Sequence, residues 1–142
     1  MSLAKEITDK KVNFEFNKEF INVFSKKIKE NDTSFLNRTL TELHPADSAD
    51  LIENLVPENR LKLIELEGFS LDPEIFIELN ESIQSDIFII LSIESIVNIL
   101  KRLESDNALK ILENLDEKKK NVVLDKLPPK DRFLLQEGLS FP

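Results

Sequence analysis

Residues 87–127 read IFIILSIESIVNILKRLESDNALKILENLDEKKKNVVLDKL. Four leucines in this segment are spaced twelve residues apart, at Leu91, Leu103, Leu115 and Leu127. An apolar pair lies three and four residues before each of them, at 87–88, 99–100, 111–112 and 123–124. Spacings of three and four place side chains on one face of an α-helix, so the segment predicts a series of short amphipathic helices of equal length.

The same spacing continues toward both ends of the chain. Leucines recur on this register at Leu43, Leu55, Leu79 and Leu139, and the register is broken only at Glu67, where Leu66 comes one residue early. Further apolar pairs are Leu51–Ile52, Leu63–Ile64 and Ile75–Phe76. Each repeat is expected to hold about two helical turns, roughly 12 Å long, and a turn of about four residues. Because isolated helices this short are marginal in water, each must bury its apolar face against its neighbours. We therefore predict an all-α fold, a right-handed superhelix of about nine or ten short helices with a twelve-residue repeat.

Local signals predict where the order begins and where helices end. Residues 1–13 are polar and lysine-rich without periodicity, so we expect a flexible N-terminal tail, followed by one superhelical domain over 14–142. Phe20, Phe24 and Ile28 give an apolar face to a first, longer helix, which Asn31-Asp32 should end before a second begins near Thr33. Later turns are expected at Pro45, Pro57, Gly68-Phe69, Asn80, Ser92, Glu104-Ser105, Asp116 and Pro128-Pro129. Proline suits the first turn of a helix, where its missing N–H is not needed.

The composition argues against catalysis and against a membrane span. The chain has no cysteine, two glycines and one histidine, His44. Without a second imidazole we expect no Ser-His-Asp or Cys-His set and no histidine-based metal cluster. The chain also has no glycine-rich loop for a phosphate. His44 precedes a proline at a helix start, where a capping or packing role is more common than catalysis. The longest apolar run, Ile87 to Leu91, is far shorter than the roughly 20 residues of a membrane span.

The charge is unevenly distributed along the chain. The net charge is −8, but residues 42–106 hold fifteen acids and four bases, a net −11, whereas the remaining residues sum to +3. Such a field repels nucleic acid and attracts divalent cations or a basic partner. The alternative is a solvated acidic face that only keeps the protein in solution. Two acid pairs, Asp47/Asp50 and Glu78/Glu81, are expected to face one side of a helix, a spacing of weak specificity.

Residues 43–60 read LHPADSADLIENLVPENR, and this segment resembles the opening repeats of the cytosolic N domain of MgtE-type magnesium transporters. The resemblance extends through the repeats to Leu127-Pro128-Pro129-Lys130-Asp131-Arg132 and covers about residues 20–142. It implies that the chain is the regulatory N domain without its CBS pair and without its membrane pore. In that family the N domain closes against the CBS pair when Mg²⁺ is plentiful, and ions held by acids at the junction keep the channel shut.

The resemblance also implies particular site residues. Aligning the repeats on their leucines places Glu74 and Asp106 where the family has acids that contact bridging Mg²⁺. A further acid is expected one turn after Asp106, but this chain has Lys110, whose ammonium would repel the ion. Glu74 and Asp106 equally suit the role of first-turn acids that stabilise a helix N-terminus. Because a half-site leaves most of the six Mg²⁺ positions to water, the isolated fragment is expected to bind Mg²⁺ weakly or not at all.

The partners and location follow from the same resemblance. It implies the CBS domain pair of the same polypeptide as partner, no nucleic acid, a membrane contact only through the missing pore, and a homodimeric parent protein at the cytoplasmic face of the cell membrane. The alternative function is an acidic helical protein-interaction scaffold that resembles flagellar motor switch modules and binds a basic partner.

Overall fold

The computed structural model describes residues 17–67 and 70–140. The predicted tail over 1–13, the start of order near Phe14 and the turn at Gly68-Phe69 lie outside these residues. Across the described ranges the chain forms ten helices and no strand, which confirms the all-α prediction. It divides into two compact units, Met1–Leu79 and Asn80–Pro142, and each is described by itself. The extension of one superhelical domain over both units stays a prediction.

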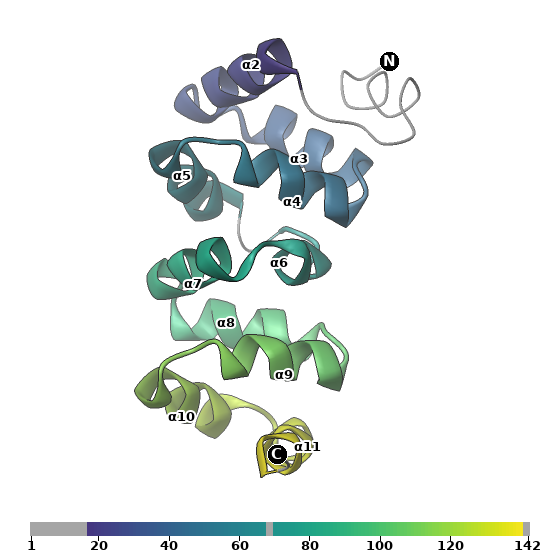
Figure 1. Cartoon of the computed structure of the whole chain (residues 1–142), viewed down its shortest axis with the longest axis vertical. Helices are drawn as coiled ribbons and strands as arrows, with labels where there is room; N and C mark the ends of the chain where they lie inside the picture. Colours follow the sequence, from purple (N-terminus) through teal and green to yellow (C-terminus); the bar gives the residue numbers. More distant parts are fainter. Residues whose placement is uncertain (1–16, 68–69, 141–142) are drawn as a thin grey trace. The chain divides into compact units, whose positions relative to one another are not determined.

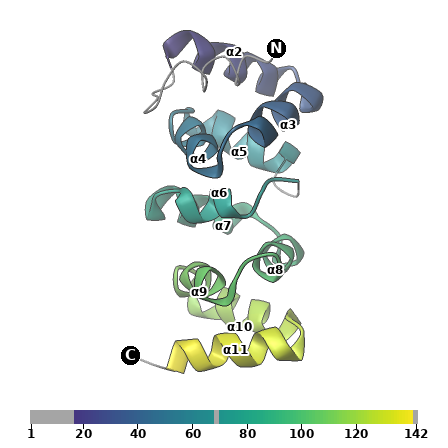
Figure 2. The same cartoon turned by 90° about the vertical axis from the view of Figure 1, so that its right-hand side faces the viewer.

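The first unit contains helices α2 (Lys18–Lys29), α3 (Thr33–Glu42), α4 (Pro45–Glu53), α5 (Pro57–Glu67) and α6 (Glu74–Glu78) (Figure 1). Helix α2 packs against α3 and α5, and α4 lies beside α6 (Figures 1 and 2). Prolines begin α4 and α5, as predicted, because proline has no N–H to lose at a first helical position. The core of this unit is built from fully buried side chains that include Phe24, Leu36, Leu51, Leu63 and Phe76.

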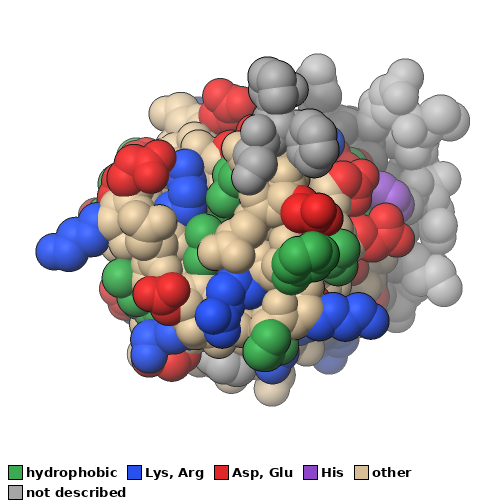
Figure 3. Space-filling view, turned by 90° about the horizontal axis from the view of Figure 1, so that it is seen from below, with side chains coloured by type: hydrophobic (Ala, Val, Ile, Leu, Met, Phe, Trp, Pro, Cys, Tyr) green, Lys and Arg blue, Asp and Glu red, His purple; other side chains and the backbone are tan. Residues whose placement is uncertain are grey.

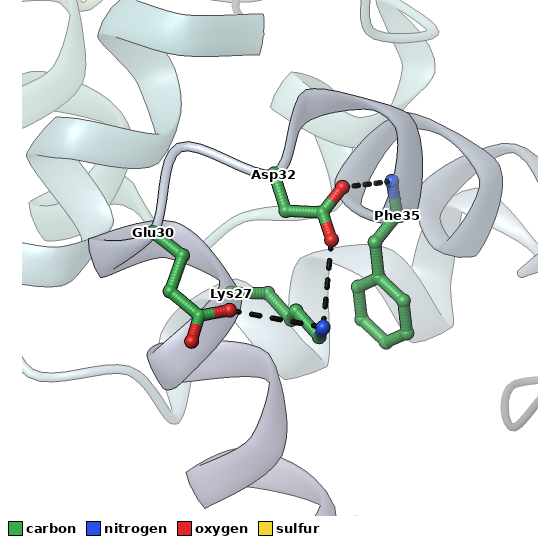
Figure 4. Close-up of polar contacts among 4 residues, drawn as sticks. All are labelled: Lys27, Glu30, Asp32 and Phe35. Carbon is green, nitrogen blue, oxygen red and sulfur yellow. Dashed lines mark hydrogen bonds and ion pairs between the residues drawn. The ribbon is translucent and has the colours of Figure 1, made fainter.

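A compact turn joins α2 to α3, close to the predicted position. Asn31 has φ 57°, in the left-handed region that asparagine tolerates, and Asp32 then caps α3 by accepting the Phe35 N–H at 3.1 Å. The Lys27 ammonium lies 3.4 Å from Asp32 Oδ2, 3.7 Å from Glu30 Oε1 and 5.4 Å from the centroid of the Phe35 ring (Figure 4). One lysine therefore holds the end of α2 against the start of α3.

The second unit contains α7 (Glu81–Ile90), α8 (Ile93–Lys101), α9 (Ser105–Glu113), α10 (Glu117–Lys126) and α11 (Pro129–Ser140). Their first residues are 81, 93, 105, 117 and 129, twelve residues apart. Helix α8 packs against α10, and α9 packs closely against α11 (Figure 1). At Gly138 of α11 an added Cβ would lie 2.8 Å from Leu109 Cδ2, so glycine permits this close approach of the two helices.

The helices are longer than the two turns predicted. Apart from α6, which has five residues, they hold nine to twelve residues. The reason is that the turns are short: after α3, α6 and α7 a leucine in extended conformation is followed at once by a capping side chain. Leu79 has ψ 147°, and Asn80 then accepts the Ile83 N–H at 2.9 Å to begin α7. The same turn corrects the prediction for Glu78 and Glu81, which lie at the end of α6 and the start of α7 and share no helix.

Burial follows the sequence pattern closely. All apolar pairs identified from the sequence are buried, from Leu51–Ile52 through Val123–Leu124, which confirms that they form the core. The spaced leucines divide into two groups. Buried are Leu43, Leu55, Leu79, Leu115 and Leu127, whereas Leu91, Leu103 and Leu139 are half-buried.

Two basic side chains complete the ends of neighbouring helices. Arg60 of α5 is 8% exposed and donates to the carbonyls of Ile52 (3.1 Å), Glu53 (3.3 Å) and Leu55 (2.9 Å) at the end of α4. In the second unit the Lys119 ammonium of α10 donates to the carbonyls of Phe88 and Ile89 at the end of α7. The last carbonyls of a helix have no intrahelical donor, so these cations supply what the helix lacks.

Candidate functional site

Glu74, the first predicted Mg²⁺ contact, is the first residue of α6 in the first unit. Its side chain is half-buried, and its backbone N–H donates to Asp72 Oδ1 at 3.0 Å. Asp72 thus stabilises the start of α6, which is only five residues long. Glu74 is a first-turn acid, where its charge complements the helix dipole, and within residues 17–67 and 70–140 its carboxylate forms no ion pair.

Asp106, the second predicted contact, lies in the first turn of α9 in the second unit. It is exposed, and its Oδ1 accepts the N–H of Asn107 at 3.0 Å. Lys110 lies in the last turn of the same helix and is also exposed. A positive charge one turn after Asp106 lowers the affinity of this face for a cation.

The two predicted residues therefore belong to different units. Over the described part of the chain, no group of three or more His, Cys, Asp or Glu side chains is placed to hold a metal ion. Mg²⁺ requires six oxygen ligands in near-octahedral geometry. The described residues thus supply fewer than three such side chains at either position.

The start of α4 gathers the chain's one histidine and two acids. His44 caps this helix, with Nδ1 accepting the Ala46 N–H at 3.1 Å, so the expected capping role is confirmed. Asp47 and Asp50 follow in the same helix, as predicted for this pair, and both are half-buried. Burial raises the pKa of the Asp47 carboxyl above its ordinary value, while the charge of His44 lowers it and that of Asp50 raises it.

This raised pKa makes a prediction about acid stability. A carboxyl that binds its proton more tightly when folded favours the folded state below its ordinary pKa, and this contribution is lost as the pH rises through the raised value. As the pH rises from below the ordinary value of 3.8 through the raised pKa of Asp47, the wild type should therefore lose stability relative to Asp47→Asn. Urea unfolding of both chains at several pH values measures the difference, and a difference that stays constant or grows in the opposite direction would contradict the prediction.

Glu67 is the notable acid that the sequence did not single out as a site. It occupies the register position of a leucine at the end of α5 and is only 5% exposed. Its Oε2 accepts the Ser70 hydroxyl at 2.8 Å, and within the described residues its buried Oε1 has no hydrogen-bond partner. An unpaired buried oxygen costs stability, so this position departs from the packing rule that the leucines obey elsewhere. The only signal in the sequence was the break in register itself.

A surface hollow of about 360 Å³ lies in the second unit, along α8 and the end of α10. Its lining combines one carboxylate, two ammonium groups, an amide and an apolar side chain, from Glu94, Lys101, Lys126, Asn98 and Val97. Glu94 is in the first turn of α8, and Lys101 and Lys126 are in the last turns of their helices, where each charge suits the helix dipole. The mixed charge does not form a cation site.

Comparison with known proteins places the chain in a family. Residues 43–142 match the MgtE intracellular N domain. The chain belongs to this family. The match begins at Leu43, the first leucine of the register, and includes every acid named above as a candidate ligand. None of the described helices of this MgtE N domain has both the length and the hydropathy that a membrane span needs.

The fold of this MgtE N domain also has a solved counterpart. The crystal structure of the soluble part of a magnesium transporter superposes on this chain with a TM-score of 0.68, at 18% sequence identity. The match covers 88% of this chain and 50% of the other, so the chain spans about half the length of that protein. No curated protein matches the chain.

Proposed function

We propose that the chain is the magnesium-sensing regulatory domain of a magnesium channel or transporter, and that it closes against a CBS pair through bridging Mg²⁺ when Mg²⁺ is abundant. The observation that carries this proposal is the family match over residues 43–142. The matched structure is that of a magnesium transporter's soluble part and is twice as long, which leaves room for a partner domain. The role is regulatory and not enzymatic, at the cytoplasmic face of the membrane, within a homodimeric parent.

The charge of the chain supports a mechanism based on shared ions. Residues 42–106 carry a net −11, and Glu74 and Asp106 are first-turn carboxylates that belong to no group of three or more candidate ligands in the described part of the chain. Two acidic surfaces repel until divalent cations with oxygen ligands bridge them. Binding of these shared ions then supplies the free energy that couples domain closure to the gate.

The fold expected for this role is a right-handed superhelix with a twelve-residue repeat. Its support is the regular spacing of helix starts from α7 to α11 and the burial of every apolar pair. Single-layer stacks of this kind present long faces to a partner. Small-angle scattering of the chain tests the extended shape, since a spherical particle of 142 residues would contradict it.

Mg²⁺ binding by the isolated chain is expected to be weak, with a dissociation constant of about 1 mM or higher, because each half-site leaves most ligand positions to water. In a chain that continues into the CBS pair, the midpoint of Mg²⁺-dependent compaction should rise about fivefold or more for Glu74→Gln. Asp106→Asn should act less strongly, because Lys110 already weakens that position, and Lys110→Glu should lower the midpoint. Calorimetry and scattering measure the two quantities.

Asp125→Asn is the matched control, since it removes an equal charge from an exposed position of α10. A micromolar affinity in the isolated chain, or equal midpoints for Glu74→Gln and Asp125→Asn, would contradict the shared-ion mechanism.

The second candidate is a scaffold that binds a basic protein through the acidic faces. Its support is the same net −11 over residues 42–106. In that case the affinity for the partner would fall with salt and would not depend on Mg²⁺ beyond its ionic strength.

A further inference from the structure

The outer faces of the last two helices combine exposed apolar and basic side chains. Residues spaced by three or four share one face of a helix, which groups Lys118, Val122 and Lys126 on α10 and Lys130, Phe133 and Leu134 on α11. We call these six residues the basic apolar face. The two helices contact each other, so the two stripes lie on neighbouring elements of one unit.

The apolar members of this face project outward. Phe133 is 62% exposed, Leu134 42% and Val122 37%. Helix α11 packs against α9 and buries Leu135, so the neighbouring Phe133 and Leu134 lie on the side away from the core. A large apolar side chain in water gains free energy wherever a surface covers it.

The charge around these side chains is positive. Residues 117–132 contain six bases and three acids, a net +3. Lys119, Lys120 and Arg132 are engaged with backbone carbonyls or with Glu117. The other three, Lys118, Lys126 and Lys130, are exposed and form no ion pair in the described part of the chain. The carboxylates of Asp125, Asp131 and Glu137 are interspersed and reduce this field without cancelling it.

The space-filling view from the α11 end shows the same mixture. Hydrophobic side chains stand next to Lys and Arg side chains, with acidic side chains between some of them (Figure 3). Protruding apolar groups flanked by lysines match a lipid interface, in which apolar tips enter the acyl boundary and ammonium groups meet phosphates. A helical protein partner would instead need an apolar groove on this chain that accepts the partner's side chains.

We propose that the basic apolar face docks on an anionic phospholipid surface. The docking uses Lys118, Lys126 and Lys130 for the headgroups and Phe133 with Leu134 for the apolar boundary. It goes beyond the magnesium-dependent closure and needs no metal ion, so it is tested in EDTA, and its failure leaves the closure mechanism untouched.

The test is cosedimentation of the full chain with vesicles at low salt. Partitioning to vesicles of equal phosphatidylcholine and phosphatidylglycerol should exceed that to pure phosphatidylcholine by about tenfold or more. Replacing Lys118, Lys126 and Lys130 together by glutamine should lower it about 100-fold, since each lysine near such a surface contributes about fivefold. Phe133→Ser should lower it about tenfold.

Matched controls separate this face from net charge and from folding. Lys18, Lys26 and Lys29 of α2 are exposed, and their joint replacement by glutamine changes the net charge equally. Val56, 58% exposed in the first unit, is the control for Phe133 when replaced by serine. Circular dichroism verifies that each variant is folded, and Leu134→Asn substitutes for Phe133→Ser if that variant unfolds.

The expected result is a loss of binding only in the variants of the basic apolar face. Equal partitioning to both vesicle types, or equal losses in the two lysine triples, would overturn the proposal. A loss with the lysines but none with Phe133→Ser or Leu134→Asn would also overturn it and would assign the face to an acidic protein.

Discussion

Replacing Arg60 by methionine should lower the free energy of unfolding by about 3 kcal/mol, because the carbonyls at the end of α4 lose the three hydrogen bonds that Arg60 donates. The guanidinium is 8% exposed and donates to three carbonyls of one helix end, at 2.9 to 3.3 Å. Methionine keeps the apolar stem but offers no N–H. Arg60→Lys should also be destabilising, since a single ammonium cannot reproduce the planar fork. Urea unfolding followed by circular dichroism measures the change, because the chain has neither tryptophan nor tyrosine.

Arg132 provides the control within the same chain. It occupies the same place in a matching Leu-x-Pro-x-x-Arg segment, residues 127–132, as Arg60 does in residues 55–60. Its Nη2 donates to the Leu127 carbonyl at 3.3 Å, whereas its buried Nε has no partner among the described residues. Arg132→Met should therefore cost less than about 1 kcal/mol. Equal losses in the two variants would show that the additional carbonyl contacts of Arg60 contribute little to stability.

Phe76→Ala should destabilise the first unit by about 3–5 kcal/mol, the range for removing a buried phenylalanine from a core. Phe76 is completely buried in α6, a helix of five residues that packs against α4. A helix this short has no stability of its own, so its place depends on the side chains it buries. In addition to this global loss, the amides of α6 should exchange with solvent faster than those of α4, because α6 opens first.

Phe133→Ala is the matched substitution at an exposed site, with 62% of the side chain exposed in the wild type. It should change the stability by less than about 0.5 kcal/mol. A loss below about 1.5 kcal/mol for Phe76→Ala would mean that α6 is held by its backbone and by the Asp72 contact to the Glu74 N–H, and not by its core contact.

The helices and the core could be predicted from sequence because both depend on neighbours in the chain. Capping residues such as Asn80 and Ser92 act on an N–H three residues away, and an apolar pair and its leucine lie within five positions. Helix lengths were underestimated, since the turn was given about four residues. An extended leucine and one cap are enough to reverse the chain, as at Leu79-Asn80.

The candidate site was predictable only in part. For His44 the sequence favoured a capping or packing role, and the structure shows a cap. Glu74 and Asp106 lie in first turns, but their role as ligands depends on groups that this chain does not hold. Arg60 and Glu67 were not recognised, because a charged residue in a polar-looking segment gives no sign that its side chain will be buried.

The sequence by itself determined the helical class, the helix starts and the apolar pairs of the core, because local hydrogen bonds and periodic burial depend on residues a few positions apart. Only the tertiary structure decided which charges lie inside. Arg60 is buried where the carbonyls of α4 receive it, and Glu67 is buried at a leucine position with one oxygen unpaired. Such contacts depend on how one helix packs on another, and no spacing along the chain encodes them.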